Sequence, residues 1–485
     1  MSSDVRNLEP QSLWNNFANI NAIPRASKKE EQIIQYMLDF GERLGLPTYK
    51  DQIGNVIIKK PATPGMEDRK TVVMQSHLDM VHQKNNDTLF DFATEGIKML
   101  VEGDWVKADG TTLGADNGIG VATIMAVLAS TDIAHPSLEA LFTIDEETGM
   151  TGALELQGGH LDADIMLNLD TEDDDELTIG CAGGIDITAE GTYEQEPAPE
   201  GYEGYEITVR GLSGGHSGMD IHKGLGNANK IMNRILYSLH SACNIRLASV
   251  DGGSLRNAIP RESVATLAIP TGHIGAMQST IGSLAAILKT EYDYTDSALD
   301  ISLAAVSVDK VMSREQQGKI LAAIYATHNG IYRMSPDIKD LVQTSNNLAR
   351  VLIKDGKYSV LCLTRSSVDS EKMDLVNSIT ATYTLIGAKV STGGSYPGWT
   401  PRPTSAIVSI MADLYRELFQ SEPHVNACHA GLECGILGTN YPDMEMISFG
   451  PNIRGAHSPD ERVQISSVQK YWGYLLETLK RIPAK

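Results

Sequence analysis

Histidines and carboxylates follow the apolar segments of this chain at the same kind of position. Segment 71–76 runs into His77 and Asp79, 138–143 into Glu146 and Glu147, and 165–169 into Asp170. Segment 444–449 leads into the loop that carries His457, and Asp116 lies just before an expected buried helix. Open α/β sheets bind ligands beyond the carboxyl ends of their strands, so we expect these side chains to converge in space. The candidates are His77, Asp79, Asp116, Glu146, Glu147, Asp170 and His457.

Imidazoles and carboxylates without a thiolate form a nitrogen and oxygen donor set that suits zinc, cobalt or manganese. Each member alone has an ordinary explanation, because paired glutamates are usual in solvated turns and Asp116 could cap a helix. Asp170 likewise opens an acidic stretch that runs to Glu176. The position that all of them share after apolar segments makes a metal site the stronger interpretation.

The spacing within two pairs indicates a division of labour. His77 and Asp79 are two residues apart, so in extended chain both point the same way and the carboxylate can orient the imidazole. Glu146 and Glu147 are neighbours, so in extended chain they diverge. One of them can bind metal while the other acts as a general base on a metal-bound water.

Continuous apolar segments position these groups. Four of them are short enough for strands covered on both faces, which is typical of a helix-flanked α/β sheet: 54–58, 71–74, 138–143 and 165–169. Residues 119–128 are apolar nearly all round, which predicts a buried helix. Ser27 and Glu30 have the spacing of a capping box ahead of a helix with apolar residues at helical intervals.

The pattern of apolar and polar residues changes between residues 191 and 394. Segments 205–210, 263–269 and 358–363 alternate more clearly, and helices are expected near 227–242, 276–292, 314–327 and 371–385. A half-exposed sheet with helices is an α+β pattern. Continuous apolar segments occur again after residue 394, where we expect a helix over 404–419, a strand over 444–449 and a closing helix over 467–479. We therefore predict an α/β catalytic domain (1–190 and 395–485) interrupted by an inserted α+β domain (191–394).

Composition excludes several function classes. The chain has 485 residues, too many for one ordinary core, and its 40 basic against 62 acidic residues give a net charge of −22. Such a surface repels nucleic acid and anionic membranes. The sequence contains no run of about 18 apolar residues, which argues against a membrane-spanning helix. The first residues lack the apolar core of a secretory signal. Five scattered cysteines without a CxxC pair favour a cytoplasmic protein.

Taken together, the motifs resemble the co-catalytic zinc peptidase family M20, and within it the aminoacyl-histidine dipeptidase branch of carnosinase-like enzymes. The resemblance covers essentially the whole chain. It is carried by the candidates above within His77-Leu-Asp79, Gly114-Ala-Asp-Asn117 and Glu146-Glu-Thr-Gly149, and by Gln83–Asp87, Thr111–Gly118, Gly180–Asp186, Gly214-Gly-His-Ser-Gly218, Leu255-Arg-Asn-Ala-Ile-Pro260 and His429–Gly435.

The resemblance implies a cytosolic dipeptidase with two Zn²⁺ per subunit, for which Co²⁺ or Mn²⁺ could substitute, acting on Xaa-His dipeptides such as carnosine. Asp116 would bridge both metals. His77 and Asp170 would complete one site, Glu147 and His457 the other, with Asp79 supporting His77. Glu146 would take a proton from the bridging water and return it to the leaving amine. Two metals about 3.5–4 Å apart polarise the scissile carbonyl and supply hydroxide near neutral pH.

The inserted domain would be the lid of this family, through which the resemblance implies a homodimer. His216 resembles the lid histidine that stabilises the oxyanion, often from a partner subunit. Asn257 and Arg365 resemble the groups that hold the substrate carboxylate, and arginine suits this task as a bidentate donor. An ordinary loop histidine and a surface cation are the alternative interpretations of His216 and Arg365.

Other functions are less consistent with the sequence or differ only in the substrate. Tripeptide cleavage or N-acyl amino acid deacylation would use the same metals, because pocket contacts set the substrate. A non-catalytic metal- or peptide-binding protein is disfavoured, since Glu146 beside the expected ligand Glu147 is not needed for binding alone. The glycines near Gly114 carry no GxGxxG fingerprint and no P-loop lysine, which argues against nucleotide binding.

Overall fold

The computed structural model describes residues 2–85 and 87–485. Residues 1 and 86, which belong to the N-terminal stretch and the Gln83–Asp87 motif, lie outside the described residues. The chain divides into two compact units, each described by itself. The first unit runs to Gly180 and resumes over Trp399–Ala427 and Leu432–Lys485, and the second comprises Cys181–Gly398 and Cys428–Gly431.

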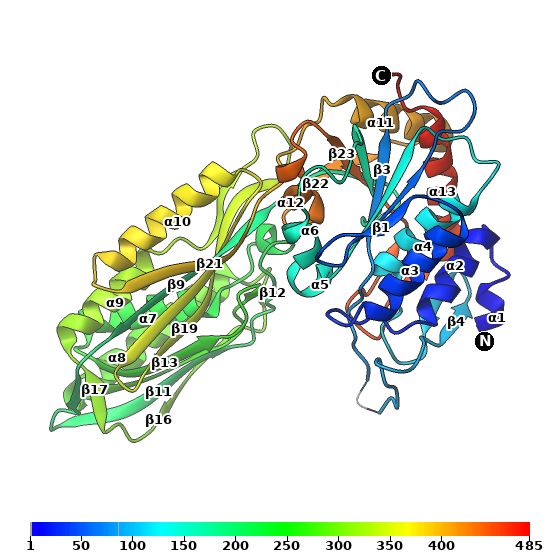
Figure 1. Cartoon of the computed structure of the whole chain (residues 1–485). Helices are drawn as coiled ribbons and strands as arrows, with labels where there is room; N and C mark the ends of the chain where they lie inside the picture. Colours follow the sequence, from blue (N-terminus) through cyan, green and yellow to red (C-terminus); the bar gives the residue numbers. More distant parts are fainter. Residues whose placement is uncertain (1, 86) are drawn as a thin grey trace. The chain divides into compact units, whose positions relative to one another are not determined.

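An eight-stranded mixed sheet forms the centre of the first unit (Figure 1). Strands β6, β3, β7 and β23 run parallel to one another, whereas β2 and β8 pair antiparallel. Every residue of β3, β6 and β7 is buried, as strands covered on both faces require. The order is β1 (Thr48–Lys50), β2 (Val56–Lys60), β6 (Leu138–Thr143), β3 (Val72–His77), β7 (Ile165–Asn168), β23 (Glu445–Ser448), β8 (Glu176–Cys181) and β22 (His424–Cys428).

Helices cover this sheet. The apolar helix α4 (Ala115–Ala129) packs against β3 and against α2 (Gln11–Asn21), while α11 (Ala406–Phe419) packs against β23 and α13 (Ile465–Lys480). Each fully buried leucine or isoleucine side chain of α4, such as Ile124, contributes about 1.5–3 kcal/mol to the free energy of unfolding. The remaining elements are α1 (Ser2–Val5), α3 (Glu31–Arg43), α5 (Glu146–Gly149), α6 (Thr151–Glu155), α12 (Glu433–Asn440), and a small sheet of β24 (Ile453–Arg454), β25 (Arg462–Gln464), β5 (Trp105–Ala108) and β4 (Met99–Glu102).

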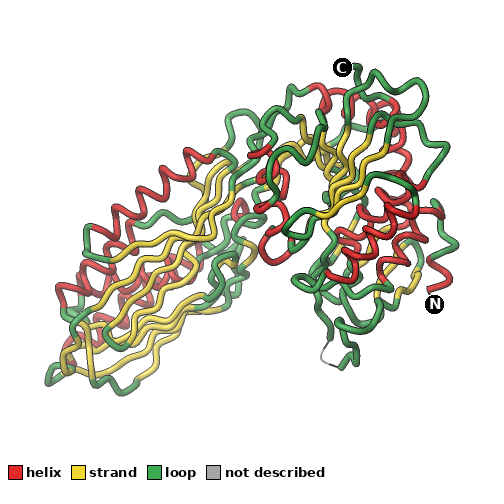
Figure 2. The backbone as a smooth tube through the Cα atoms, viewed as in Figure 1, coloured by secondary structure: helices red, strands yellow, loops and turns green. Residues whose placement is uncertain are grey.

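A nine-stranded antiparallel sheet dominates the second unit, with helices against one face (Figure 2). Its strands alternate in burial more than those of the first unit, as β15 shows. Along the sheet lie β16 (Asp300–Ala305), β11 (Tyr202–Arg210), β15 (Ser263–Pro270), β13 (Arg246–Gly253), β19 (Val342–Lys354), β20 (Lys357–Ser366), β9 (Gly183–Thr192) and β21 (Lys389–Tyr396), with β18 (Gly330–Met334) paired to β19.

The helices of the second unit and the inner face of its sheet share one apolar core. Asn227 begins the first of these helices, because its side chain accepts hydrogen bonds from the backbone N–H groups of Asn229 and Lys230. The helices are α7 (Ala228–Ala242), α8 (Ile274–Glu291), α9 (Arg314–Ala326) and α10 (Asp369–Thr384), and the short elements are β10 (Gln195–Pro197), β12 (Gly215–His216), β14 (Ala258–Ile259), β17 (Lys310–Met312) and the 3₁₀ turns Ile221–Lys223 and Thr271–His273.

The predicted α/β class with a helix-flanked mixed sheet and an inserted α+β segment is confirmed. The domain boundaries after residues 190 and 394 stay a prediction, and the structure itself changes unit after Gly180 and Gly398. The capping box at Ser27 is wrong: α3 begins at Glu31 without a side-chain cap, because the Ser27 hydroxyl instead donates to Asp79. Among the described residues, no helix is both long and apolar enough to span a bilayer.

Candidate metal centre

The candidate ligands gather beyond the carboxyl ends of adjacent strands. Strands β6, β3 and β7 are parallel neighbours, so their last residues lie along one edge of the sheet, with His77 opposite Thr143 in the register. His77 ends β3, Glu146 follows β6 after two residues, and Asp170 follows β7. The position common to the candidates in the sequence thus corresponds to one location in the first unit.

Asp116 lies between two groups of ligands. Its Oδ1 is 3.2 Å from His77 Nε2, and its Oδ2 is 3.2 Å from His457 Nε2. Asp170 completes the first group, with its Oδ1 3.6 Å from His77 Nε2, and Glu147 completes the second, with its Oε2 2.9 Å from His457 Nε2. Within each group the potential ligand atoms lie within 4.8 Å of one another. One carboxylate with an oxygen in each of two such groups has the arrangement of a bridging ligand.

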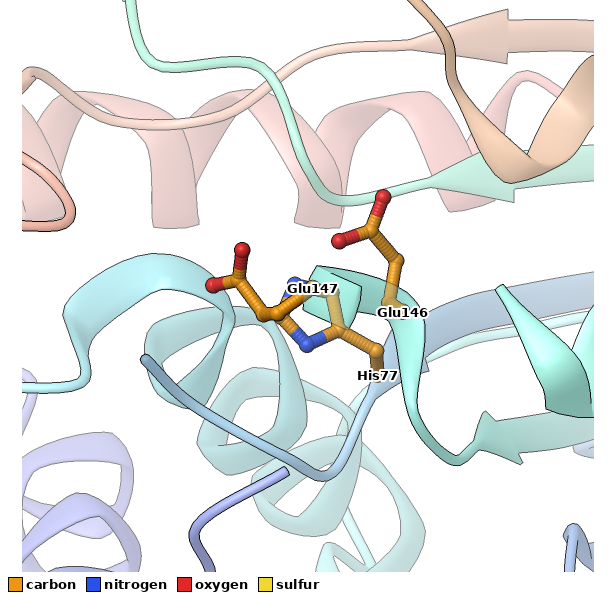
Figure 3. Close-up of side chains that lie close together, drawn as sticks. All are labelled: His77, Glu146 and Glu147. Atoms are coloured by element: carbon orange, nitrogen blue, oxygen red, sulfur yellow. The ribbon is translucent and has the colours of Figure 1, made fainter. Parts of the chain in front are cut away.

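Glu146 and Glu147 occupy a short helical turn rather than the extended chain expected from the sequence. Asp145 has a left-handed backbone (φ 53°) that redirects the chain from β6 into α5, and the hydroxyls of Thr148 and Thr151 hold its carboxylate. In the view of Figure 3 the two carboxyl groups extend to different sides of the His77 ring, yet one ligand atom of each lies within 4.8 Å of the other and of a ring nitrogen, so the expected divergence of the two glutamates stays a prediction. Glu146 forms a candidate ligand group with His77 and Glu147 and is absent from the two groups that contain Asp116.

Asp79 links His77 to the turn that carries both glutamates. Its Oδ1 lies 3.3 Å from His77 Nδ1 and accepts a hydrogen bond from the backbone N–H of Glu146 at 3.0 Å. Its Oδ2 accepts from the backbone N–H of Glu147 at 3.2 Å and from the Ser27 hydroxyl at 2.8 Å. This completely buried carboxylate faces the imidazole, and the Asp79 carbonyl oxygen lies 3.2 Å from the same Nδ1, so both parts of Asp79 contact the ring.

Burial and mutual attraction shift the pKa values of these groups. Burial opposes the imidazolium of His77, but contacts with Asp116, Asp170 and Asp79 raise its pKa well above the ordinary value. The contacts with Asp116 and Glu147 raise the pKa of His457 to about 11. Burial, followed by the neighbouring acids, raises the pKa of Glu146 well above its usual range. The buried carboxylates thus stabilise positive charge on His77 and His457, and the same carboxylates could stabilise a bound cation.

The side chains present fit a divalent metal centre. The donors are imidazole nitrogens and carboxylate oxygens, and no cysteine belongs to the clusters found among the described residues. Within the described structure, Asp170 Oδ1 is buried and has no hydrogen-bond partner. A buried carboxylate oxygen in that state is costly unless a cation satisfies it.

Three residues expected in the lid lie close together in the second unit. Arg365 is buried and donates to the Tyr396 hydroxyl at 2.8 Å. His216 Nδ1 accepts the backbone N–H of Met219 at 3.0 Å, which leaves the proton of the neutral ring on Nε2. The Asn257 carbonyl accepts the N–H of Ser217, the residue after His216, at 2.8 Å. A side chain at Gly218 would meet both His216 and Arg365 at 3.2 Å.

A family model described as peptidase family M20/M25/M40 matches residues 73–481. The chain belongs to this family. The match spans both units and every candidate ligand, so the resemblance inferred from the motifs is confirmed.

Relatives of this M20 peptidase cover its whole length. The chain is 45% identical over 484 residues to the cytosol non-specific dipeptidase of Escherichia coli (strain K12), with 100% of each covered. It is also similar to the crystal structure of aminoacylhistidine dipeptidase from Vibrio alginolyticus, with a TM-score of 0.94, 43% identity and 100% of both chains covered. A tripeptidase from Staphylococcus aureus, at 17% identity, shares the fold, with a TM-score of 0.57 over 98% of this chain and 99% of that one.

Sequence reasoning assigned no role to four buried polar residues of this M20 peptidase. Arg25 and Glu461 contact the loops that carry the ligands. Glu433 accepts from Gln75 and Thr143 at 2.6 Å each, and burial raises its pKa to about 7. His429 lies 2.7 Å from the Ser345 hydroxyl, and burial, then Arg365, lowers its pKa to about 3. His429 and Glu433 stand in a motif that the sequence did flag, whereas Arg25 and Glu461 carry no such signal.

Proposed function

We propose that this M20 peptidase is a dipeptidase that hydrolyses Xaa-His dipeptides such as carnosine with two bound Zn²⁺ ions. The observation that carries the proposal is the placement of Asp116, whose two carboxylate oxygens each lie 3.2 Å from a different histidine. His77 and Asp170 would hold one metal with Asp116, and Glu147 and His457 the other. Bound metals of this kind polarise a peptide carbonyl and lower the pKa of water.

Glu146 is the proposed general base and acid. It is adjacent to the ligand groups, and its backbone N–H is held by Asp79, so its carboxylate is positioned to take a proton from water and deliver it to the leaving amine. Asp79 itself keeps the His77 ring in one orientation.

The second unit is proposed to anchor the substrate. Arg365 and Asn257 would hold the free carboxylate, and the Nε2 proton of His216 would be donated to the carbonyl oxygen as its negative charge develops. Support comes from the shared location of the three residues and from the burial of Arg365. A guanidinium in such surroundings keeps its orientation and binds a carboxylate more strongly than an exposed one.

The dipeptide class follows the names of the two relatives that match over the full length. One is named a non-specific dipeptidase and the other an aminoacylhistidine dipeptidase. We therefore propose Xaa-His peptides as substrates, and the strictness for histidine is measured by comparing carnosine with Xaa-Leu dipeptides and with tripeptides. If tripeptides are cleaved faster than any dipeptide, the chain is a tripeptidase of this family instead.

Assembly and location complete the proposal. A homodimer through the second unit is supported by β16, an edge strand whose residues after Asp300 are uncharged and at least partly exposed, because such an edge can pair with another copy. The cytosol is the compartment stated in the name of the Escherichia coli relative. Sedimentation equilibrium of the full chain measures the oligomeric state.

Replacement of Glu146 tests the proposal. The Glu146→Ala variant is expected to bind two equivalents of Zn²⁺ like the wild-type protein but to lose carnosine turnover by at least about 100-fold, the lower range for a positioned general base. Glu155→Ala, which changes an exposed glutamate on α6, is the matched control and should retain turnover. Normal turnover in the Glu146 variant would exclude the assigned role.

A further inference from the structure

Two buried ionisable side chains, Arg25 and Glu461, contact the ligand-bearing loops of the first unit. We propose that Arg25 and Glu461 are positioning residues that set the separation of the metal ligands, by fixing residues 77–80, where β3 ends, against residues 113–116, where α4 begins. The inference rests on the proposed metal site and adds to it, because neither residue has an atom in the ligand clusters.

Glu461 holds the backbone of the loop that carries Asp116. Its Oε2 accepts the N–H groups of Leu113 and Gly114 at 2.7 and 2.9 Å, and its Oε1 accepts those of Ala115 and Asp116 at 2.7 and 3.2 Å. Glu461 is only 2% exposed. Four consecutive N–H groups bound by one carboxylate restrain the backbone of this segment, and with it the position from which the Asp116 side chain starts.

Arg25 ties this loop to the one that carries His77 and Asp79. Its Nη1 donates to the carbonyl oxygens of Leu78 and Asp79, each at 3.1 Å, and its Nη2 donates to the carbonyl oxygen of Gly114 at 2.5 Å. Arg25 is also only 2% exposed. The planar guanidinium therefore bridges both loops, a geometry that a lysine ammonium cannot reproduce.

The glycines of the Gly114-Ala-Asp-Asn-Gly118 motif make room for this guanidinium. A side chain at Gly114 would come within 2.5 Å of Arg25 Nη2, and one at Gly118 within 2.6 Å of the same atom. Gly114 also has a left-handed backbone, with φ at 70°. The motif thus serves the contact with Arg25 as well as the placement of Asp116, an explanation that the sequence alone does not supply.

A purely structural role is the competing explanation. Buried charges are expensive, and well-packed apolar residues stabilise a fold as well or better, so charge retained beside a metal centre favours a function in positioning. Burial lowers the pKa of Arg25 to about 10, which leaves the guanidinium charged at neutral pH. The two explanations differ in one measurable respect: only positioning changes metal affinity in a protein that remains folded.

The test measures Zn²⁺ affinity of the stripped full-length protein by competition with a chromophoric chelator, together with the unfolding temperature with and without Zn²⁺. Glu461→Gln can accept at one oxygen only, and Arg25→Lys retains the charge without the fork. Both are expected to weaken Zn²⁺ binding roughly 10- to 100-fold, as other residues that orient metal ligands do, and to shrink the rise in unfolding temperature that Zn²⁺ produces.

Matched controls come from the exposed ion pair of Glu417 and Arg481, whose charged atoms lie 2.7 Å apart. Glu417→Gln and Arg481→Lys should keep wild-type Zn²⁺ affinity. Unchanged affinity in the Glu461 and Arg25 variants, or a lower unfolding temperature alone, would overturn the inference. If Glu461→Gln does not fold, Glu461→Asp replaces it. A wild-type protein that binds no Zn²⁺ would instead refute the proposed function.

Discussion

Replacing Asp79 with asparagine removes a charge and one acceptor from the carboxylate that contacts both His77 and the turn carrying Glu146 and Glu147. The carboxylate receives two backbone N–H groups, from Glu146 at 3.0 Å and Glu147 at 3.2 Å, and the Ser27 hydroxyl at 2.8 Å, and it faces His77 Nδ1 at 3.3 Å. Asparagine keeps the shape, so neither a cavity nor a new steric contact complicates the result.

The size of the effect follows from these contacts. If Oδ2 becomes the amide nitrogen, the NH₂ group faces the Glu147 N–H and the Ser27 hydroxyl, and if Oδ1 does, it faces the Glu146 N–H and the His77 ring. In either case two contacts of the charged carboxylate are lost. Each is worth about 1.5–3 kcal/mol, so a loss of about 3 kcal/mol is the lower end of the range. About 1.4 kcal/mol corresponds to a factor of ten. When the lost energy had held Glu146 and His77 in place, kcat/KM therefore falls roughly 100-fold.

The assay is kcat/KM for carnosine at saturating Zn²⁺, with circular dichroism to establish that the variant is folded. Asp68→Asn, at an exposed aspartate with 75% of its side chain accessible, provides the same chemical change without these contacts. A value for Asp79→Asn within about threefold of the wild type would refute the reasoning that Asp79 orients the catalytic groups.

Two further predictions concern other parts of the molecule. Arg365→Met should raise the KM for carnosine at least about tenfold and leave the KM for its C-terminal amide nearly unchanged, since the amide lacks the carboxylate that Arg365 is proposed to bind; equal effects on both compounds would contradict this role. Gly118→Ala should lower the free energy of unfolding by about 1–3 kcal/mol, because the added methyl group would lie 2.6 Å from Arg25 Nη2, whereas Gly272→Ala, with nothing within 4 Å, should not destabilise the protein in thermal unfolding.

Much of the fold could be predicted because apolar runs report burial directly. The strand predicted over 138–143 has the same first and last residues as β6, and the buried helix predicted over 119–128 lies within α4. Convergence of His77 and Asp170 followed from one rule, that parallel strands present their carboxyl ends at the same edge. That rule needs only the strands and the residues after them, both of which are visible in the sequence.

What the sequence did not predict depends on partners distant along the chain. Glu461 and Arg25 resemble ordinary surface charges in the sequence, because their partners at 113–116 and 78–79 lie hundreds or tens of residues away. The Ser27 hydroxyl was assigned to a helix cap, but a carboxylate from β3's loop binds it instead. Local patterns describe local hydrogen bonds, and these residues satisfy distant ones.

Restoring metal to the stripped protein tests the central claim most directly. Carnosine hydrolysis should be abolished after thorough treatment with a chelator, and titration with Zn²⁺ should restore it until two equivalents per chain are bound, as the two ligand groups sharing Asp116 require. Activity that survives complete removal of metal, or full activity in a protein that binds no Zn²⁺, would contradict the account.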